Sequence, residues 1–86
     1  MGQVEQIVNE LLAVDSDISA YTVRLERERG EITNTINKAQ SAFGNQQGGL
    51  ILVTTLYKTV QSIVNADSAL YIARQEIKKY VQTLQK

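Results

Sequence analysis

Apolar residues recur at heptad spacing along nearly the whole of this 86-residue chain, and the pattern is interrupted once, at residues 44–49. Steps of three and four residues are typical of a helix that packs lengthwise on another helix. The interruption reads Gly-Asn-Gln-Gln-Gly-Gly, a composition that suits a chain reversal. We therefore predict an all-α fold, a two-helix antiparallel hairpin forming one domain over residues 1–86, with helices over about 3–42 and 50–85 and a loop over about 43–49.

The predicted seam between the helices follows one apolar row on each. The row on the first helix comprises Val4, Ile7, Leu11, Val14, Ile18, Tyr21, Leu25, Ile32, Ala39 and Ala42. The row on the second comprises Leu52, Leu56, Thr59, Ile63, Ala66, Leu70, Ala73, Ile77, Tyr80 and Leu84. Acidic residues gather early in the first helix and basic residues late in the second. An antiparallel hairpin brings these opposite charges together, which favours that arrangement.

A second apolar row on the helix over 50–85 is predicted to bind a partner. It comprises Val53, Tyr57, Val60, Val64 and Tyr71. One partner helix does not cover two such rows unless it straddles both, which is the alternative interpretation. The interpretation we favour is an interface that joins hairpins into a four-helix bundle, either as a homodimer or with a second helical-hairpin protein. Tyr57 and Tyr71 are its expected aromatic anchors.

The turn is predicted to comprise Phe43 and the glycines Gly44, Gly48 and Gly49, with the glycines free to adopt positive φ. Gly30 is a weak point within the first helix, because glycine costs about 1 kcal/mol relative to alanine there. A three-helix arrangement with a break near Gly30 is the alternative to the hairpin.

Asp67 and Arg74 lie one heptad apart among apolar neighbours. Either their side chains reach water from the edge of the seam, or they set the register of a partner through a charged contact.

The composition argues against catalysis and against a metal or cofactor site. The chain has no histidine, cysteine, proline or tryptophan, so it lacks the residues for thiol chemistry, a Ser-His-Asp triad or zinc ligation by Cys or His. Its carboxylates are interleaved with arginines or project on different sides of a helix. We predict no catalytic, cofactor-binding or metal-binding residues.

Charge and hydropathy narrow the expected partners further. Lys plus Arg equal Asp plus Glu at nine each, whereas a nucleic-acid-binding protein usually carries a basic excess. The longest apolar run, Leu50 to Val53, is far shorter than the roughly 20 residues that cross a bilayer. We expect neither nucleic-acid binding nor a membrane span. The N-terminal residues do not have the pattern of a cleavable signal peptide.

The length, the near-equal helices and the mid-chain loop with an aromatic residue beside glycine, Phe43-Gly44, resemble the WXG100 or ESX-like proteins of type VII secretion. That family carries Trp-X-Gly in the turn and a C-terminal Tyr followed four residues later by Asp or Glu. Here Tyr57, Tyr71 and Tyr80 are followed at that spacing by Gln61, Gln75 and Leu84. Small helical partners of LXG toxins are similar and lack these motifs too. The resemblance implies a secretion substrate, a co-substrate or a toxin-targeting partner, either secreted without a cleavable signal peptide or cytoplasmic.

Two other classes share this architecture. Type III secretion needle subunits are similar hairpins, but their turn contains proline, which this chain lacks. A homo-oligomeric coiled-coil adaptor or an accessory protein of a phage or plasmid is the alternative with no link to type VII secretion.

Overall fold

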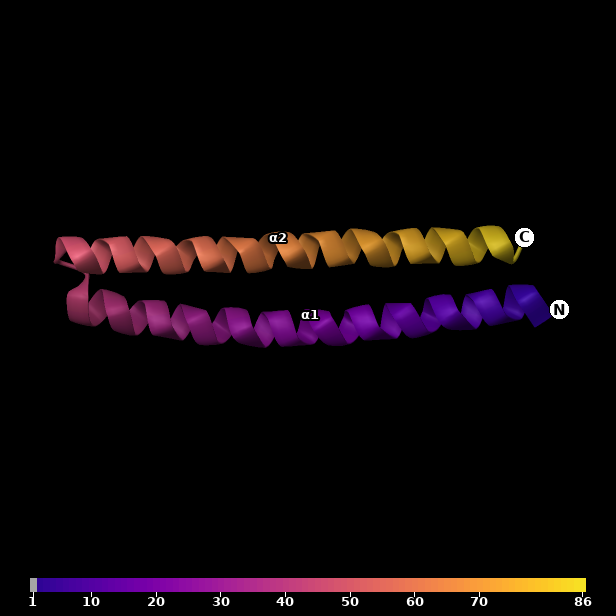
Figure 1. Ribbon diagram of the computed structural model, residues 1–86, viewed down its shortest axis with the longest axis horizontal. Helices are drawn as coiled ribbons and strands as arrows, with labels where there is room; N and C mark the ends of the chain where they lie inside the picture. The colour runs from indigo at the N-terminus through magenta and orange to yellow at the C-terminus, as the bar shows by residue number, and fades with distance from the viewer. Residues whose placement is uncertain (1) are drawn as a thin grey trace.

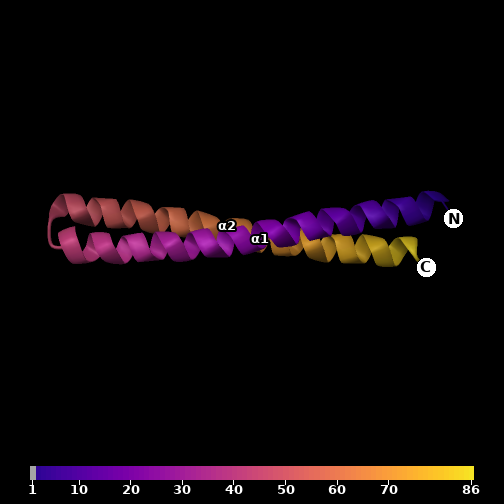
Figure 2. The same cartoon turned by 90° about the horizontal axis from the view of Figure 1, so that it is seen from below.

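The computed structural model describes residues 2–86 and confirms the helical hairpin. Helix α1 runs over Gly2–Phe43 and has 42 residues, and α2 runs over Gln47–Leu84 and has 38. The helices lie antiparallel in a rod measuring 65 × 15 × 12 Å (Figure 1). Seen from below, they cross near mid-length, as expected of helices wound around a heptad seam (Figure 2). The two ends of the chain lie together, opposite the turn.

The turn is tighter than the sequence pattern predicts. Only residues 44–46 separate the helices, whereas a loop over about 43–49 was expected. The amide of Gly44 donates to the carbonyl of Gln40 at 3.0 Å, and the amide of Leu50 donates to the carbonyl of Gln46 at 2.9 Å. These bonds satisfy backbone groups at the end of α1 and the start of α2. Gln47, Gly48 and Gly49 therefore belong to the first turn of α2.

Gly49 is needed for close approach of the two helices, and no glycine near the turn is needed for positive φ. None of the glycines that the structure describes has positive φ, contrary to the expectation from sequence. Gly49 is buried, and a Cβ atom there would overlap the carbonyl oxygen of Phe43. The start of α2 thus packs directly against the backbone at the end of α1, at a separation that a larger residue would prevent.

The observed seam differs from the predicted seam at every second position. At each of these positions the seam residue is the one that follows the predicted residue in the sequence. In heptad notation the seam consists of positions a and d. On α1 the a positions are Val8, Asp15, Thr22, Arg29 and Ile36, and the d positions are Leu11, Ile18, Leu25, Ile32 and Ala39. On α2 the a positions are Val53, Val60, Asp67, Arg74 and Val81, and the d positions are Leu56, Ile63, Leu70, Ile77 and Leu84. All of these residues are buried or half-buried.

The predicted seam therefore shares the d positions with the observed seam but not the a positions. Val14 and Tyr21, which were expected in the seam, are 48% and 44% exposed, and Asp15 and Thr22 lie in the seam in their place. Hydrophobicity alone favours the row with Val14 and Tyr21. The structure instead places a more polar row between the helices and leaves a more apolar row outside.

The most completely buried part of the seam lies near the turn. Ile36 is 1% exposed and packs with Ala39 and Val53, and Ile32, Leu56 and Val60 cover this cluster in part. A two-helix rod has no third layer to complete such a core. Most other seam residues are accordingly only half-buried.

Helix α1 continues without a break through Gly30, so the structure has two helices and not three. No atom outside the local helix lies within 4 Å of the point where a Cβ of Gly30 would stand. Gly30 is thus an exposed helical residue and not a packing notch.

Candidate interaction surface

One ion pair joins the two helices within the described residues. The guanidinium of Arg74 donates from Nε to Oδ1 of Asp15 at 2.9 Å and from Nη2 to Oδ2 at 3.2 Å. These hydrogen bonds lower the pKa of Asp15, partial burial opposes the shift, and the charges of Arg74 and Lys78 reinforce it. Arg74 therefore sets the register of α2 on α1 within the hairpin, where the sequence left open a partner contact or a solvated position.

The other polar seam residues are accommodated locally. The Thr22 hydroxyl donates to the carbonyl of Ile18 at 3.1 Å, and Arg29 pairs with Glu26 at 2.7 Å. The Oδ1 atom of Asp67 is buried and has no hydrogen-bond partner within the protein.

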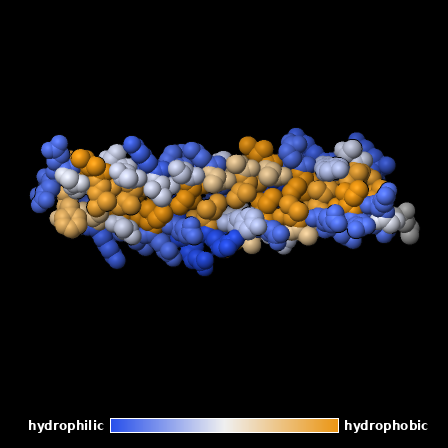
Figure 3. All heavy atoms as spheres, viewed as in Figure 1, coloured by the Kyte–Doolittle hydropathy of each residue, from blue (hydrophilic) through white to orange (hydrophobic). Residues whose placement is uncertain are grey.

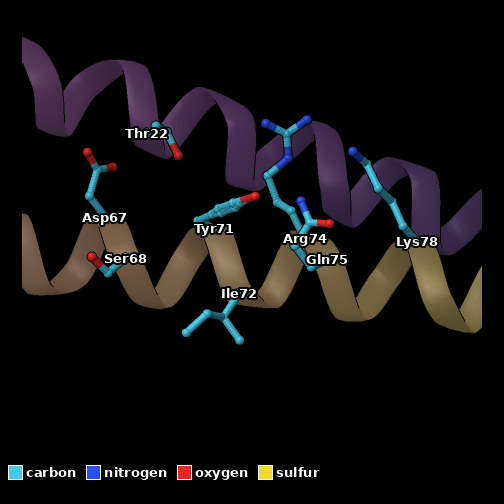
Figure 4. A pocket seen from close by; sticks show the side chains of 8 residues that line it. All are labelled: Thr22, Asp67, Ser68, Tyr71, Ile72, Arg74, Gln75 and Lys78. Atoms are coloured by element: carbon cyan, nitrogen blue, oxygen red, sulfur yellow. The ribbon is translucent and has the colours of Figure 1, made fainter.

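A shallow groove, lined by polar and charged residues together with Tyr71 and Ile72, lies on this side of the rod (Figure 4). The side chains of Asp67, Arg74 and Lys78 rise from α2 toward α1, whereas Ile72 points away; Thr22 of α1 lies above the part of the groove that holds Asp67 and Tyr71. The groove is open and carries both signs of charge. Among residues 2–86 no three Asp, Glu, His or Cys side chains are grouped so that they could hold a metal ion.

The five residues predicted to form a partner interface do not form one free surface. Val53 is 6% exposed and belongs to the hairpin core, and Val60 packs against that core. Val64 is half-buried. Tyr57 and Tyr71 are exposed, at 53% and 56%. Helix α1 thus already covers the valines nearest the turn, and the two tyrosines are left on the surface.

Large apolar side chains are exposed at several places on both helices, including Leu12, Val23, Ile51 and Ile72. Some of the exposed side chains belong to a row that the sequence pattern assigned to the seam. This row consists of the residues that immediately precede each a position, and we call it the outer row. On α1 the outer row is Ile7, Val14, Tyr21, Glu28, Thr35 and Ala42. On α2 it is Leu52, Thr59, Ala66, Ala73 and Tyr80.

Helix geometry places both halves of the outer row on the same side of the rod. Each residue advances about 100° around an α-helix, so the residue before each a position lies beside the d position. In an antiparallel pair these positions of the two helices flank the same edge of the seam. Because both helices are right-handed and α2 lies above α1 in Figure 1, the edge that carries the outer row faces the viewer there.

A continuous apolar band runs along that face, with hydrophilic groups on both edges (Figure 3). Four residues of the outer row, Val14, Tyr21, Leu52 and Tyr80, have exposed large side chains. The guanidinium of Arg24 lies 5.0 Å from the centre of the Tyr21 ring, at the polar margin. A contiguous apolar band of this length differs from singly scattered exposed residues, which need no special explanation.

The apolar character of the outer row is concentrated in the half of the rod that holds the chain ends. Val14 and Ala73 immediately precede the paired residues Asp15 and Arg74 on antiparallel helices, so they lie at nearly the same level, offset by about 3 Å along the rod. One heptad toward the turn, Tyr21 is level with Ala66. One heptad toward the ends, Ile7 is level with Tyr80. Nearer the turn, Glu28 is level with Thr59.

Neither helix, over residues 2–86, combines the length and the apolar content that a membrane crossing requires. The apolar band in Figure 3 lies on one face of the helix pair.

Comparisons with models of protein families, with curated proteins and with solved structures find no match. The resemblance to type VII secretion proteins therefore stands on the sequence features alone. The case for an interaction surface stands on the exposure and placement of the outer row.

Proposed function

We propose that this chain is a non-enzymatic helical interaction protein that binds other helices through the outer row. The observation that carries the proposal is the long apolar band beside a half-covered seam. Burying such a band stabilises a complex by about 25 cal/mol per Å² of apolar area removed from water. The band is uncharged for most of its length, which suits a helical partner better than a nucleic acid.

We propose type VII secretion as the setting, with the chain acting as a substrate, a co-substrate or a toxin-targeting partner. The two near-equal helices and the short turn beside Phe43-Gly44 support this assignment. Because the chain lacks the Tyr-based export motif, a partner hairpin or a toxin segment would supply the signal in this scheme. Pairing through the outer row would then be required for export.

The test follows the protein in its native host. We expect it in the culture medium when the type VII ATPase is intact and only in cells when that ATPase is deleted. Ala66→Glu places a charge in the outer row and should abolish export and partner capture. Ala20→Glu makes the same change at an exposed position of α1 on the opposite side from the seam, and it should preserve both.

Export that persists without the ATPase, or that is equally reduced by both variants, would contradict the proposed setting. A homo-oligomeric adaptor is the second candidate, and the pairing of bulky with small residues along the outer row favours it. Retention of a stable homo-oligomer inside the cell, whatever the state of the ATPase, would support that candidate instead.

A further inference from the structure

We propose that the outer row binds a second copy of this chain, face to face, with both turns at the same end, to form a four-helix bundle. This inference rests on the proposed function, because it names the helical partner and the orientation. It is carried by three features of the hairpin: its surplus surface, the polarity of its two seam rows, and the order of large and small residues along the outer row.

The hairpin exposes more surface than a protein of its mass normally does. Its accessible surface is 6415 Å². A compact monomer of this mass exposes about 5,100 Å², so the surplus is on the order of 1,300 Å². A stable protein interface covers roughly 800 Å² on each partner. One further hairpin lying along the apolar face is therefore of the right size.

The two seam rows differ in polarity in a way that suits a four-helix core. The a positions include the polar residues Asp15, Thr22, Asp67 and Arg74, together with Arg29. The d positions from Leu11 to Ala39 and from Leu56 to Leu84 are all apolar, yet most are only half-buried. The d positions border the outer row, whereas the a positions face the other side of the rod. A second hairpin on the outer row would enclose the wholly apolar row and leave the polar row at the edge.

The outer row is complementary to itself when the second copy is related by a two-fold axis along the rod. That operation keeps every level and places α1 of one copy over α2 of the other. Tyr21 then lies over Ala66 of the second copy, and Val14 lies over Ala73. Large side chains over alanines allow close packing of helices. Contacts of this kind are isologous, so each is made twice.

The reversed arrangement, with the turns at opposite ends, is less favourable. Turning the second copy end for end lays the two α1 rows on each other. Tyr21 would then approach Glu28 of the second copy, and Val14 would approach Thr35. The apolar half of each rod would be buried against the more polar half, which leaves a carboxylate without a partner. With the turns at the same end, Glu28 instead faces Thr59. The chain has no net charge, so two copies do not repel each other as a whole.

The first measurement is the mass in solution by light scattering across a dilution series. We expect twice the chain mass of 9.6 kDa for the wild type and for Ala20→Glu. Ala66→Glu should weaken the dimer about 100-fold or more, since each interface would bury two unpaired carboxylates. Circular dichroism should show that the Ala66→Glu chain is still helical, because Ala66 is exposed in the hairpin.

The second measurement fixes the orientation in the unaltered interface. The chain has no cysteine, so Asn45→Cys gives a single attachment site for a spin label at the exposed turn. With both turns at one end, the labels should lie within about 30 Å, because neighbouring helix axes are about 10 Å apart. In the reversed bundle they would be separated by a distance close to the 65 Å length of the rod.

The outcomes separate this inference from the proposed function. A dimer with closely spaced labels supports the inference. A monomer at all concentrations, or a dimer with labels at opposite ends, overturns it. If the isolated chain is monomeric but a different purified hairpin binds it in a manner that Ala66→Glu abolishes, the proposed function stands and the second-copy inference fails.

Discussion

Arg74 donates hydrogen bonds from Nε and Nη2 to both carboxylate oxygens of Asp15 across the seam. The two residues are almost equidistant from Asn45 in the turn, so the pair forms only when the helices meet in one register. A one-residue slip would separate the pair and rotate the outer row into the seam. A charged contact here specifies which of the two candidate rows, the one with Asp15 and Arg74 or the more apolar outer row, is enclosed between the helices.

Asp15→Asn should lower the thermal stability of the hairpin near neutral pH. The hydrogen bonds from Arg74 lower the pKa of Asp15 in the folded state relative to about 3.9 in an unfolded chain. The stabilisation is therefore fully present above about pH 4 and is lost as the pH falls through the folded-state pKa. We expect the Tm difference between wild type and variant to shrink below pH 4. Asp17→Asn, at an exposed position of α1, is the matched control. An equal Tm difference at pH 7 and pH 2 would show that the ion pair does not stabilise the register.

Ile36→Ala should destabilise the hairpin by about 2–4 kcal/mol, because it removes buried methyl groups and leaves a cavity beside Val53. Ile51→Ala, at a position on the outside of α2, should change the free energy of unfolding by less than about 0.5 kcal/mol. Urea denaturation at one fixed protein concentration gives both values. Equal losses in the two variants would mean that the region near the turn is not the best-packed part of the seam.

Gly30→Ala should stabilise the protein by about 1 kcal/mol. The helix already continues through Gly30, and the added methyl group meets open space. Thermal unfolding followed by circular dichroism would show the increase in Tm. A decrease would indicate that a partner packs against this glycine in solution.

Gly49→Ala should have the opposite effect, although it is the same substitution in a helix. The added Cβ would overlap the carbonyl oxygen of Phe43, so the start of α2 would have to move away from α1. We expect a loss of about 1–3 kcal/mol, which is typical of overpacking. Gly48→Ala is the neighbouring control, since a Cβ on Gly48 meets no atom within 4 Å. A Gly49→Ala chain as stable as the Gly48→Ala chain would contradict the close approach at the turn.

The helical hairpin could be predicted from the sequence because two long heptad patterns and one glycine-rich interruption allow few other folds. The opposite charges of residues such as Asp15 and Arg74 indicated the antiparallel orientation, and the structure places this pair in contact. The length of the turn could not be predicted, because Gln47, Gly48 and Gly49 are equally compatible with a loop. Gly49 packs against the backbone of Phe43, and this contact between the two helices is not visible in the sequence pattern.

Hydrophobicity could not show which row is exposed. The d positions can form a seam either with the a positions or with the outer row, and both seams follow the heptad spacing. The row with Val14, Tyr21, Ala66 and Ala73 is the more apolar one, and it lies outside. One signal in the sequence distinguishes the rows: Asp15 and Arg74 occupy matching levels of the other row. Charge complementarity across the expected reversal point was therefore more informative than apolar content. The charge pair indicates which row lies in the seam. The exposed apolar residues of the outer row are the surface that we propose binds a second copy.

The three-residue turn also has a kinetic consequence. With both rods tethered at Gly44–Gln46, pairing closes the shortest loops first, beside Ile36 and Val53, and each later layer toward the chain ends closes a longer one. Contacts between the helices should therefore form first beside the turn during folding and open first at the end that holds the chain termini. Amide hydrogens around Ile36 would then exchange most slowly, and those near Val8 and Val81 would exchange sooner; the proposed pairing with a second copy would slow exchange at this open end.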